Sequence, residues 1–149
     1  MIRPFSTSDL NAILKIERES FPKSPYDRMT FIHLHSLYPE HFLVYTGATN
    51  GEEDRIWGYI IFSPEGHIIS LAVLPPQRKK GVGKELLRKA METPHLKGLQ
   101  AEVRRSNLGA QAFYLRMGFR IVGAVPNYYG NEDALIIQWT PIRGWAVWH

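Results

Sequence analysis

The sequence predicts one α/β domain of the α+β kind, in which a mixed, mostly antiparallel central sheet is flanked by helices. Its 149 residues suit a single compact domain over residues 1–149. The hydrophobic pattern changes several times between a period of two and a helical period, which indicates interspersed strands and helices. Three strand candidates in the middle have short connections and are expected to be antiparallel neighbours. The expected order is β-α-α-β-β-β-α-β-α-β-β.

The N-terminal part is expected to hold a short strand and two helices. The strand covers residues 2–5, the first helix residues 6–21 and the second helix residues 26–37. Ser6 and Asp9 are placed at the N-cap and N3 positions of the first helix. Four residues of that helix lie on one side at helical spacing, namely Leu10, Ile13, Leu14 and Glu17.

The middle of the chain is expected to form three antiparallel strands, at residues 41–45, 56–62 and 67–73. Residues 47–54 are rich in Gly, Asn and acidic side chains, so they are interpreted as the loop of a hairpin between the first two strands. Pro75-Pro76 ends the last of the three.

The C-terminal part continues with helices and strands. Five elements are expected: a helix from Gly81 that Pro94 stops, a strand at 99–104, a helix from Asn107 to about Met117, and strands at 119–125 and 133–139. Because neighbouring residues of a strand point to opposite faces, Glu102 is expected opposite Ala101 and Val103.

Composition excludes several classes of function. The chain has no Cys, which excludes a thiol nucleophile, a disulfide and a cysteine zinc site. His33 and His35 are two apart on an expected helix and point to different sides, so no metal is expected. The net charge of +4 fits an anionic ligand, an acidic partner or nucleic acid without deciding among them. Without a signal peptide or an apolar run of about 20 residues, we expect a cytoplasmic protein with no membrane partner.

A basic turn with two glycines precedes and opens the helix after the strand at 67–73. Free N–H groups and partial positive charge at a helix start favour an anion. Gly81 and Gly83 have no Cβ, so a phosphate can approach the backbone closely. Four basic side chains add charge: Arg78, Lys79, Lys80 and Lys84. A phosphate site follows, although a basic, glycine-capped helix start without a ligand is the alternative that this stretch leaves open.

Two well-known phosphate motifs do not match this turn. A P-loop requires Gly at position 78 and Ser or Thr at position 85, which hold Arg78 and Glu85. A dinucleotide fingerprint requires a small residue where Leu86 stands. The remaining pattern, Arg-x-x-Gly-x-Gly, resembles the pyrophosphate-binding motif of the GNAT superfamily of N-acetyltransferases. The resemblance implies coenzyme A as the ligand.

A second stretch strengthens the resemblance. Residues 107–119 are similar to the superfamily's next motif, Asn-x-x-Ala-x-x-x-Tyr-x-x-x-Gly-Phe. Asn107, Ala110 and Tyr114 share one helical face, and the small Ala110 leaves room for a ligand. Tyr114 has simple packing as its alternative role. The two motifs at their expected separation favour ligand binding.

The chain resembles most the ribosomal-protein-alanine and related N-terminal acetyltransferases, from about Ile2 to Trp139. Three stretches carry this likeness: Phe-Pro-x-Ser at 21–24, Glu-Val-Arg-x-Ser-Asn at 102–107, and Asn-Tyr-Tyr with Glu-Asp-Ala at 127–134.

Three departures from that group concern the substrate more than the chemistry. The turn between Tyr129 and Glu132 is shorter, and Lys23 replaces an aromatic residue. The tail with Trp145 and Trp148 has no counterpart in the group.

The resemblance implies direct attack of a neutral amine on the thioester of acetyl-CoA. Glu102 matches the proton acceptor of the alanine acetyltransferases, and Tyr114 is the implied proton donor to the leaving sulfur. An ion pair with Arg104 or Lys97 is the alternative role of Glu102. A peptide α-amine has a pKa near 8, against about 10.4 for lysine, so it loses its proton more readily.

The implied binding residues come from the same motifs. The backbone of residues 71–73 is expected to hold the pantetheine arm as an added strand, with the Val73 N–H as the oxyanion donor. The expected cofactor-binding residues are Leu71, Ala72, Val73, Arg78, Lys79, Lys80, Gly81, Val82, Gly83, Lys84, Asn107, Ala110 and Tyr114. The expected acceptor-binding residues are Glu19, Tyr26, Tyr128 and Tyr129, each with a surface or packing role as its alternative.

We therefore expect an acyltransferase that acetylates the N-terminal α-amine of a protein or peptide. One alternative is the same fold acting on a small amine or a lysine side chain. Another is a non-catalytic module that binds CoA or nucleic acid through Arg104-Arg105 and the basic turn, although nucleic acid is not the partner we expect. The sequence leaves the oligomeric state open.

Overall fold

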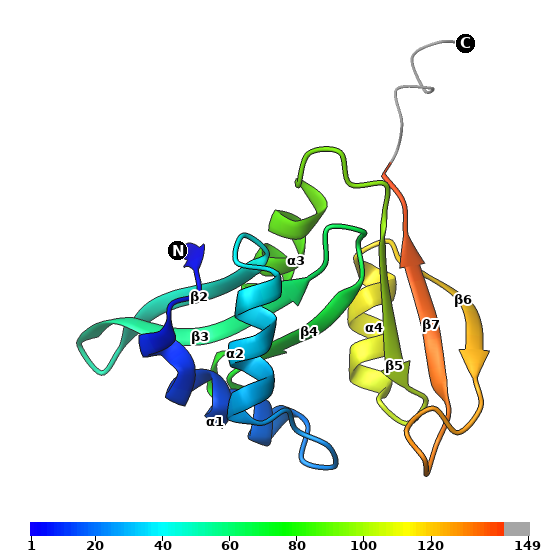
Figure 1. Ribbon diagram of the computed structural model, residues 1–149, viewed down its shortest axis with the longest axis horizontal. Coiled ribbons are helices and arrows are strands. Elements are labelled where there is room, and N and C mark those ends of the chain that lie inside the picture. Colours follow the sequence, from blue (N-terminus) through cyan, green and yellow to red (C-terminus); the bar gives the residue numbers. More distant parts are fainter. Residues whose placement is uncertain (142–149) are drawn as a thin grey trace. The chain divides into compact units, whose positions relative to one another are not determined.

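The computed structural model describes residues 1–141 and confirms the expected order of elements (Figure 1). Short 3-10 turns cover Thr7–Asp9 and Pro75–Gln77. The helices and strands are β1 (Ile2–Pro4), α1 (Leu10–Ser20), α2 (Arg28–Leu37), β2 (Phe42–Thr49), β3 (Glu52–Phe62), β4 (Ile68–Val73), α3 (Val82–Met91), β5 (Leu99–Arg104), α4 (Leu108–Arg116), β6 (Arg120–Val125) and β7 (Ala134–Trp139). Trp145 and Trp148 of the tail lie outside the described residues.

Residue contacts divide the chain into two compact units. The first unit comprises Met1–Pro64 and Ile68–Thr93, and the second comprises Glu65–His67 and the described residues from Pro94 on. Sheet β1-β2-β3-β4 belongs to the first unit and sheet β5-β7-β6 to the second, and all their strand pairs are antiparallel. The sequence predicted one central sheet. It could not show two, because alternation within a strand identifies the buried face and not the partner strand.

Helices α1 and α3 cover opposite faces of the first unit's sheet. Neighbouring residues of β3 point to opposite faces. A Cβ at Gly58 would lie 3.1 Å from Val82 of α3, whereas the next residue, Tyr59, directs its hydroxyl to Glu17 of α1. The core on the α1 side is rich in aromatic rings, among them Phe5 and Phe42, which stack with ring centroids 4.1 Å apart.

Side-chain caps set the start of the 3-10 turn that precedes α1 and the start of α2. The Asp9 carboxylate accepts a hydrogen bond from the Ser6 N–H at 2.9 Å, as the predicted capping positions require, although the first turn is 3-10. The second helix begins at Arg28, two residues later than predicted, because the Asp27 carboxylate caps it by accepting from the Thr30 N–H at 2.9 Å.

The predicted hairpin loop at 47–54 is too long. Strand β2 runs to Thr49 and β3 begins at Glu52, so Asn50 and Gly51 alone form the turn, with φ of 51° and 79°. An Asn-Gly pair with positive φ is favoured in two-residue hairpins. Gly47 is no turn residue either; it makes room for Trp57, whose indole would lie 2.5 Å from a Cβ there.

The second unit joins a short segment before β4 to the end of the chain. The predicted alternation of β5 is confirmed, since Leu99, Ala101 and Val103 are buried. The carbonyl of Gly66 accepts a hydrogen bond from the Gln100 N–H at 2.8 Å. Gly66 has a φ of 98°, and a Cβ there would lie 2.0 Å from the carbonyl oxygen of Gly98. Only glycine fits this position without displacing backbone.

We predict that Gly66→Ala lowers the free energy of unfolding by about 3 kcal/mol, because it adds a backbone collision to the strain of a positive φ. Gly51→Ala is the matched control: its φ is also positive, but a Cβ there meets nothing within 4 Å, so about 1 kcal/mol is expected. Chemical denaturation of both variants measures the difference. Equal losses would contradict the close approach at Gly66.

Candidate active site

Within residues 1–141, strand β4 pairs with another strand along one edge only, since it is the last strand of its sheet. The Leu74 N–H donates to the Trp57 carbonyl at 2.7 Å, and Val73 lies opposite Gly58. In an antiparallel pair, the groups that face the partner alternate along the strand. Ala72 therefore faces β3, whereas Leu71 presents its N–H and C=O groups and Val73 its N–H group at the open edge; the Val73 carbonyl accepts from Arg78 Nε at 3.0 Å. This edge fits an added extended chain, and it assigns the predicted amide contacts to Leu71 and Val73 rather than to Ala72.

The start of α3 has the geometry expected of a phosphate site. Gly81 is its N-cap residue with a φ of 86°, and the Glu85 N–H donates to the Gly81 carbonyl at 3.0 Å as the helix's first bond. The N–H groups of residues 82–84 thus precede the internal ladder of the helix. Gly81 is needed for its conformation, because a Cβ there would meet nothing within 4 Å.

Arg78 makes contacts within the first unit that the sequence did not suggest. Its Nε donates to the Val73 carbonyl at 3.0 Å and its Nη2 donates to Ser20 Oγ at 3.1 Å. The side chain thus ties the basic turn to the end of β4 and to α1. Lys80 donates to Gln77 Oε1 at 3.2 Å. Because Arg78 and Lys80 already have partners within the protein, the backbone N–H groups of the turn are the best-defined donors for an anion.

The start of α4 agrees with the second motif in part. Asn107 is the N-cap residue, as predicted, and its Oδ1 accepts from the Ala110 N–H at 3.1 Å. The side-chain oxygen is therefore used inside the protein, and the amide NH₂ is the group left to donate. Tyr114 is buried with its ring edge-on to Phe113 and Phe119. Packing and a chemical role are both compatible with this position.

Glu102 has neither of the ion-pair partners that the sequence offered. Its Oε1 lies 2.8 Å from His67 Nε2 and accepts from the Tyr128 hydroxyl at 3.4 Å. Arg104 instead pairs with Glu132 at 3.0 Å, and its guanidinium lies 4.0 Å from the centre of the Tyr129 ring. The two predicted acceptor-binding tyrosines therefore serve different partners. His67 was missed because residues 65–67 join β5 only through tertiary structure.

Glu102 changes the titration of the groups around it. Its hydrogen bond and negative charge raise the pKa of His67 above the ordinary 6.5, although burial opposes this. Burial, together with the charge of Glu102, raises the pKa of Tyr114 well above that of a free phenol. Burial and Glu102 also raise the pKa of Tyr128. Both phenols are thereby kept protonated near neutral pH.

On α1, the acidic residue with buried partners is Glu17 rather than the predicted Glu19. Glu19 is exposed, whereas 2% of the Glu17 surface is exposed. The Glu17 carboxylate accepts from the Tyr26 N–H at 2.9 Å and from the hydroxyl of Tyr59. Burial raises the pKa of Glu17, and these hydrogen bonds oppose the rise. The signal was present in the sequence, because Glu17 shares a helical side with three apolar residues.

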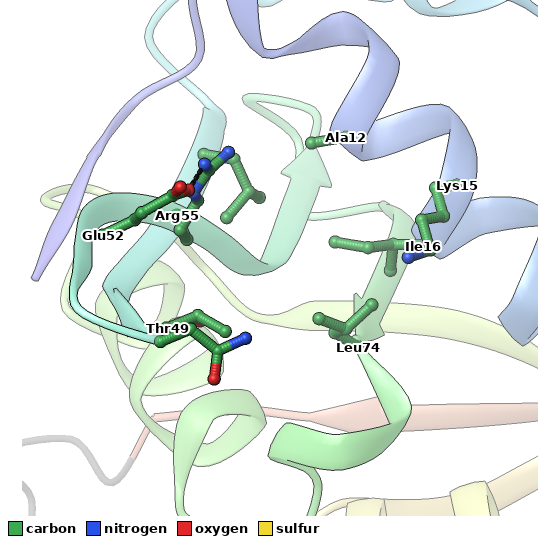
Figure 2. Close-up of a pocket in the computed structure, with 9 residues that line it drawn as sticks. Ala12, Lys15, Ile16, Thr49, Glu52, Arg55 and Leu74 are labelled. Atoms are coloured by element: carbon green, nitrogen blue, oxygen red, sulfur yellow. Dashed lines mark ion pairs between the residues drawn. The ribbon is translucent and has the colours of Figure 1, made fainter.

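A cavity of about 350 Å³ opens in the first unit, and none of the predicted site residues lines it (Figure 2). It lies between α1 and the β2–β3 hairpin, and Figure 2 shows Ile16 and Leu74 as part of its apolar wall. Glu52 and Arg55 form an ion pair at its edge. Over residues 1–141, no cluster of three or more His, Asp or Glu side chains could hold a metal ion. No helix in the same range is long and apolar enough to cross a membrane.

Comparison with known proteins identifies the family. The sequence model of the acetyltransferase (GNAT) family matches residues 10–119. An N-alpha-acetyltransferase of Sulfolobus acidocaldarius is 34% identical over 153 residues, covering 91% of this chain and 89% of that protein. The ribosomal protein bS18-alanine N-acetyltransferase of Escherichia coli K12 is 30% identical over 143 residues, covering 91% and 94%. The crystal structure of Ard1 from Thermoplasma volcanium has a TM-score of 0.82 and 28% identity, covering 96% and 98%.

The chain therefore belongs to the acetyltransferase (GNAT) family. It is an N-acetyltransferase with the fold of that family, and the relatives named above include the ribosomal-protein-alanine acetyltransferases that the sequence resembles. The expected fold class and enzyme class are confirmed. The roles of individual residues stay predictions.

We predict that His67→Gln destabilises the protein more at pH 6 than at pH 9. A raised pKa in the folded state means that the contact of His67 with Glu102 stabilises the fold fully below about pH 6.5 and is lost as pH rises through the folded pKa. Urea denaturation at the two pH values measures the difference. In a Glu102→Gln background the pH dependence of the His67→Gln effect should disappear. A cost that does not change with pH in the wild-type background would contradict the ion pair.

Proposed function

We propose that this enzyme transfers the acetyl group of acetyl-CoA to the N-terminal α-amine of a protein or peptide. The observation that carries the proposal is the open edge of β4, which leads through the basic turn into the glycine-capped start of α3. An extended amide-containing arm and a diphosphate are the two chemical groups that these features suit. The family and the names of the relatives support an acetyl donor and an α-amine acceptor.

The first unit would bind the donor. Acetyl-CoA supplies a thioester carbonyl that an amine can attack. The N–H and C=O groups of Leu71 at the open edge would hold the pantetheine amides. The Val73 N–H would stabilise the developing oxyanion. The N–H groups of residues 82–84 and the nearby lysines would bind the pyrophosphate.

The second unit would manage the protons. Glu102 is the candidate base, which would take the amine proton directly or through a water molecule. Its Oε1 lies 2.8 Å from His67 Nε2, so a neutral imidazole there would be a second group able to take up that proton from the carboxyl. Tyr114 would donate to the leaving sulfur. Its raised pKa keeps the phenol protonated but makes it a weaker acid, so a hydrogen bond from Tyr114 would stabilise the leaving thiolate even before the proton is fully transferred.

We predict that the purified enzyme releases CoA thiol from acetyl-CoA when given peptides with free N-termini. The same peptides with blocked N-termini, free lysine and polyamines should react much more slowly, because a peptide α-amine loses its proton more readily than a lysine amine. Thiol release against this panel measures the preference. A higher kcat/KM for lysine or polyamines would favour the small-amine alternative.

The same assay tests the two catalytic residues, and a module that only binds CoA would release no thiol in it. Glu102→Gln should alter the pH profile of kcat/KM, and Tyr114→Phe should lower kcat by about 100-fold. If both variants keep the wild-type profile and rate, the assigned proton transfers are wrong.

We predict that Gly83→Val weakens CoA binding at least tenfold, because branched bulk at the start of α3 blocks approach to the backbone N–H groups. Calorimetry with CoA measures the affinity. Gly123→Val, in the exposed strand β6, is the control for added branched bulk and should change the affinity little, because a Cβ there would meet only Ile136 at 3.9 Å. Unchanged affinity in Gly83→Val would show that the pyrophosphate binds elsewhere.

A further inference from the structure

A buried polar cluster in the first unit joins α1 and the segment that follows it to two strands that are distant in the sequence. It consists of Glu17 on α1, Tyr59 on β3, Ser70 on β4 and the backbone N–H of Tyr26 in the segment between α1 and α2. Tyr59 is fully buried, and Glu17 and Ser70 are 2% and 7% exposed. Nothing in the catalytic roles proposed above uses this cluster.

Each oxygen of the Glu17 carboxylate has its own set of donors. Oε2 accepts from the Tyr26 N–H at 2.9 Å. Oε1 accepts from the Tyr59 hydroxyl and, at 3.4 Å, from the hydroxyl of Ser70. Tyr59 and Ser70 also contact each other at 3.1 Å. One carboxylate therefore fastens the α1–α2 segment to two neighbouring strands.

The two ends of the cluster lie next to residues with proposed roles. Tyr26 is a predicted acceptor-binding residue, and its ring packs edge-on to the buried Phe31 at 5.9 Å. Ser70 directly precedes Leu71, which has groups at the open edge of β4. Loss of the Glu17 carboxylate would therefore remove its hydrogen bond with the Tyr26 N–H. The pairing with β3 would still hold β4 in register.

A buried carboxylate is a costly way to fasten a loop if stability is its only purpose. Glu17 has three neutral donors and no cationic partner within residues 1–141, so burial outweighs the hydrogen bonds and raises its pKa. Asp9 is a buried acid of the usual kind, because Arg3 binds it through two hydrogen bonds at 2.8 and 2.9 Å. The contrast suggests that Glu17 is kept for the geometry that it imposes on Tyr26.

We propose that Glu17 is a positioning residue for the acceptor: it fixes the backbone of Tyr26 relative to β4, so that the α1–α2 segment presents a defined surface to the incoming N-terminus. This inference rests on the proposed function. It makes Glu17 a determinant of acceptor affinity that does not itself touch the reacting atoms.

The test compares Glu17→Leu with Glu17→Gln. Leucine has similar bulk but no acceptor, so the Tyr26 N–H loses its partner. Glutamine can accept from the Tyr26 N–H through its oxygen and donate to the two hydroxyls through its NH₂, so it keeps every contact. We expect Glu17→Leu to raise the KM for the peptide about tenfold or more and to change the KM for acetyl-CoA less than about twofold, whereas Glu17→Gln stays within about threefold of wild type in both.

Asp9→Asn provides the control for lost stability. It weakens the buried ion pair with Arg3, so it should lower the thermal unfolding temperature without changing the peptide KM. If Asp9→Asn and Glu17→Leu change the peptide KM equally, or if Glu17→Leu leaves it unchanged, the positioning role is wrong.

Hydrogen exchange at the Tyr26 amide tests the anchor without any activity. We expect this amide to exchange at least tenfold faster in Glu17→Leu than in wild type or Glu17→Gln. An unchanged rate would overturn the proposal. If the wild-type enzyme acetylates no peptide, the proposed function fails, and the exchange rates still decide whether Glu17 holds the segment.

Discussion

The proposed donor site depends on one constraint: a β-strand has two hydrogen-bonding edges, and β4 uses one of them in its sheet. Pairing with β3 fixes the register, and the register decides that Leu71 and Val73 face outward. Pro75 and Pro76 then end the strand and direct the chain into the basic turn. The glycine-capped start of α3 thus follows the open edge after a fixed and short connection. An extended ligand with amides at one end and a diphosphate further along matches that order of features.

Two glutamates show how burial and partners give the same side chain different properties. Glu102 is partly buried and faces His67, a group that can carry positive charge, so charge separation across the contact is favoured. Glu17 is almost fully buried and faces hydroxyls and a backbone amide, so it serves as a hydrogen-bond acceptor that costs solvation energy. The first arrangement suits proton transfer and the second suits the positioning of backbone.

Much of the fold could be predicted from local patterns. The alternation of Leu99, Ala101 and Val103 identified β5 and its buried face, and Asn107 was identified as a helix cap from its type and position. Boundaries were less accurate where residue types have two uses. Gly47 was interpreted as a turn residue, but it lies inside β2 because the indole of Trp57 needs the space above it. Only the packed structure distinguishes a glycine needed for conformation from one needed for space.

The candidate site was also predictable only in part. Motif spacing indicated the glycine turn and Tyr114, and the family resemblance implied the role of Glu102. His67 and the Tyr59–Ser70 pair were not predictable, since their partners lie 35 and 42 or more residues away and no local pattern connects them.

By itself the sequence determined the order of elements, the buried faces and the class of chemistry, because each of these depends on residue type and short-range spacing. The tertiary structure alone decided which edge of β4 stays open, which donors bind the Glu17 carboxylate, and which group faces Glu102. Those outcomes depend on strand register and on contacts between distant segments, and a one-residue change of register would reverse the direction of every side chain in a strand.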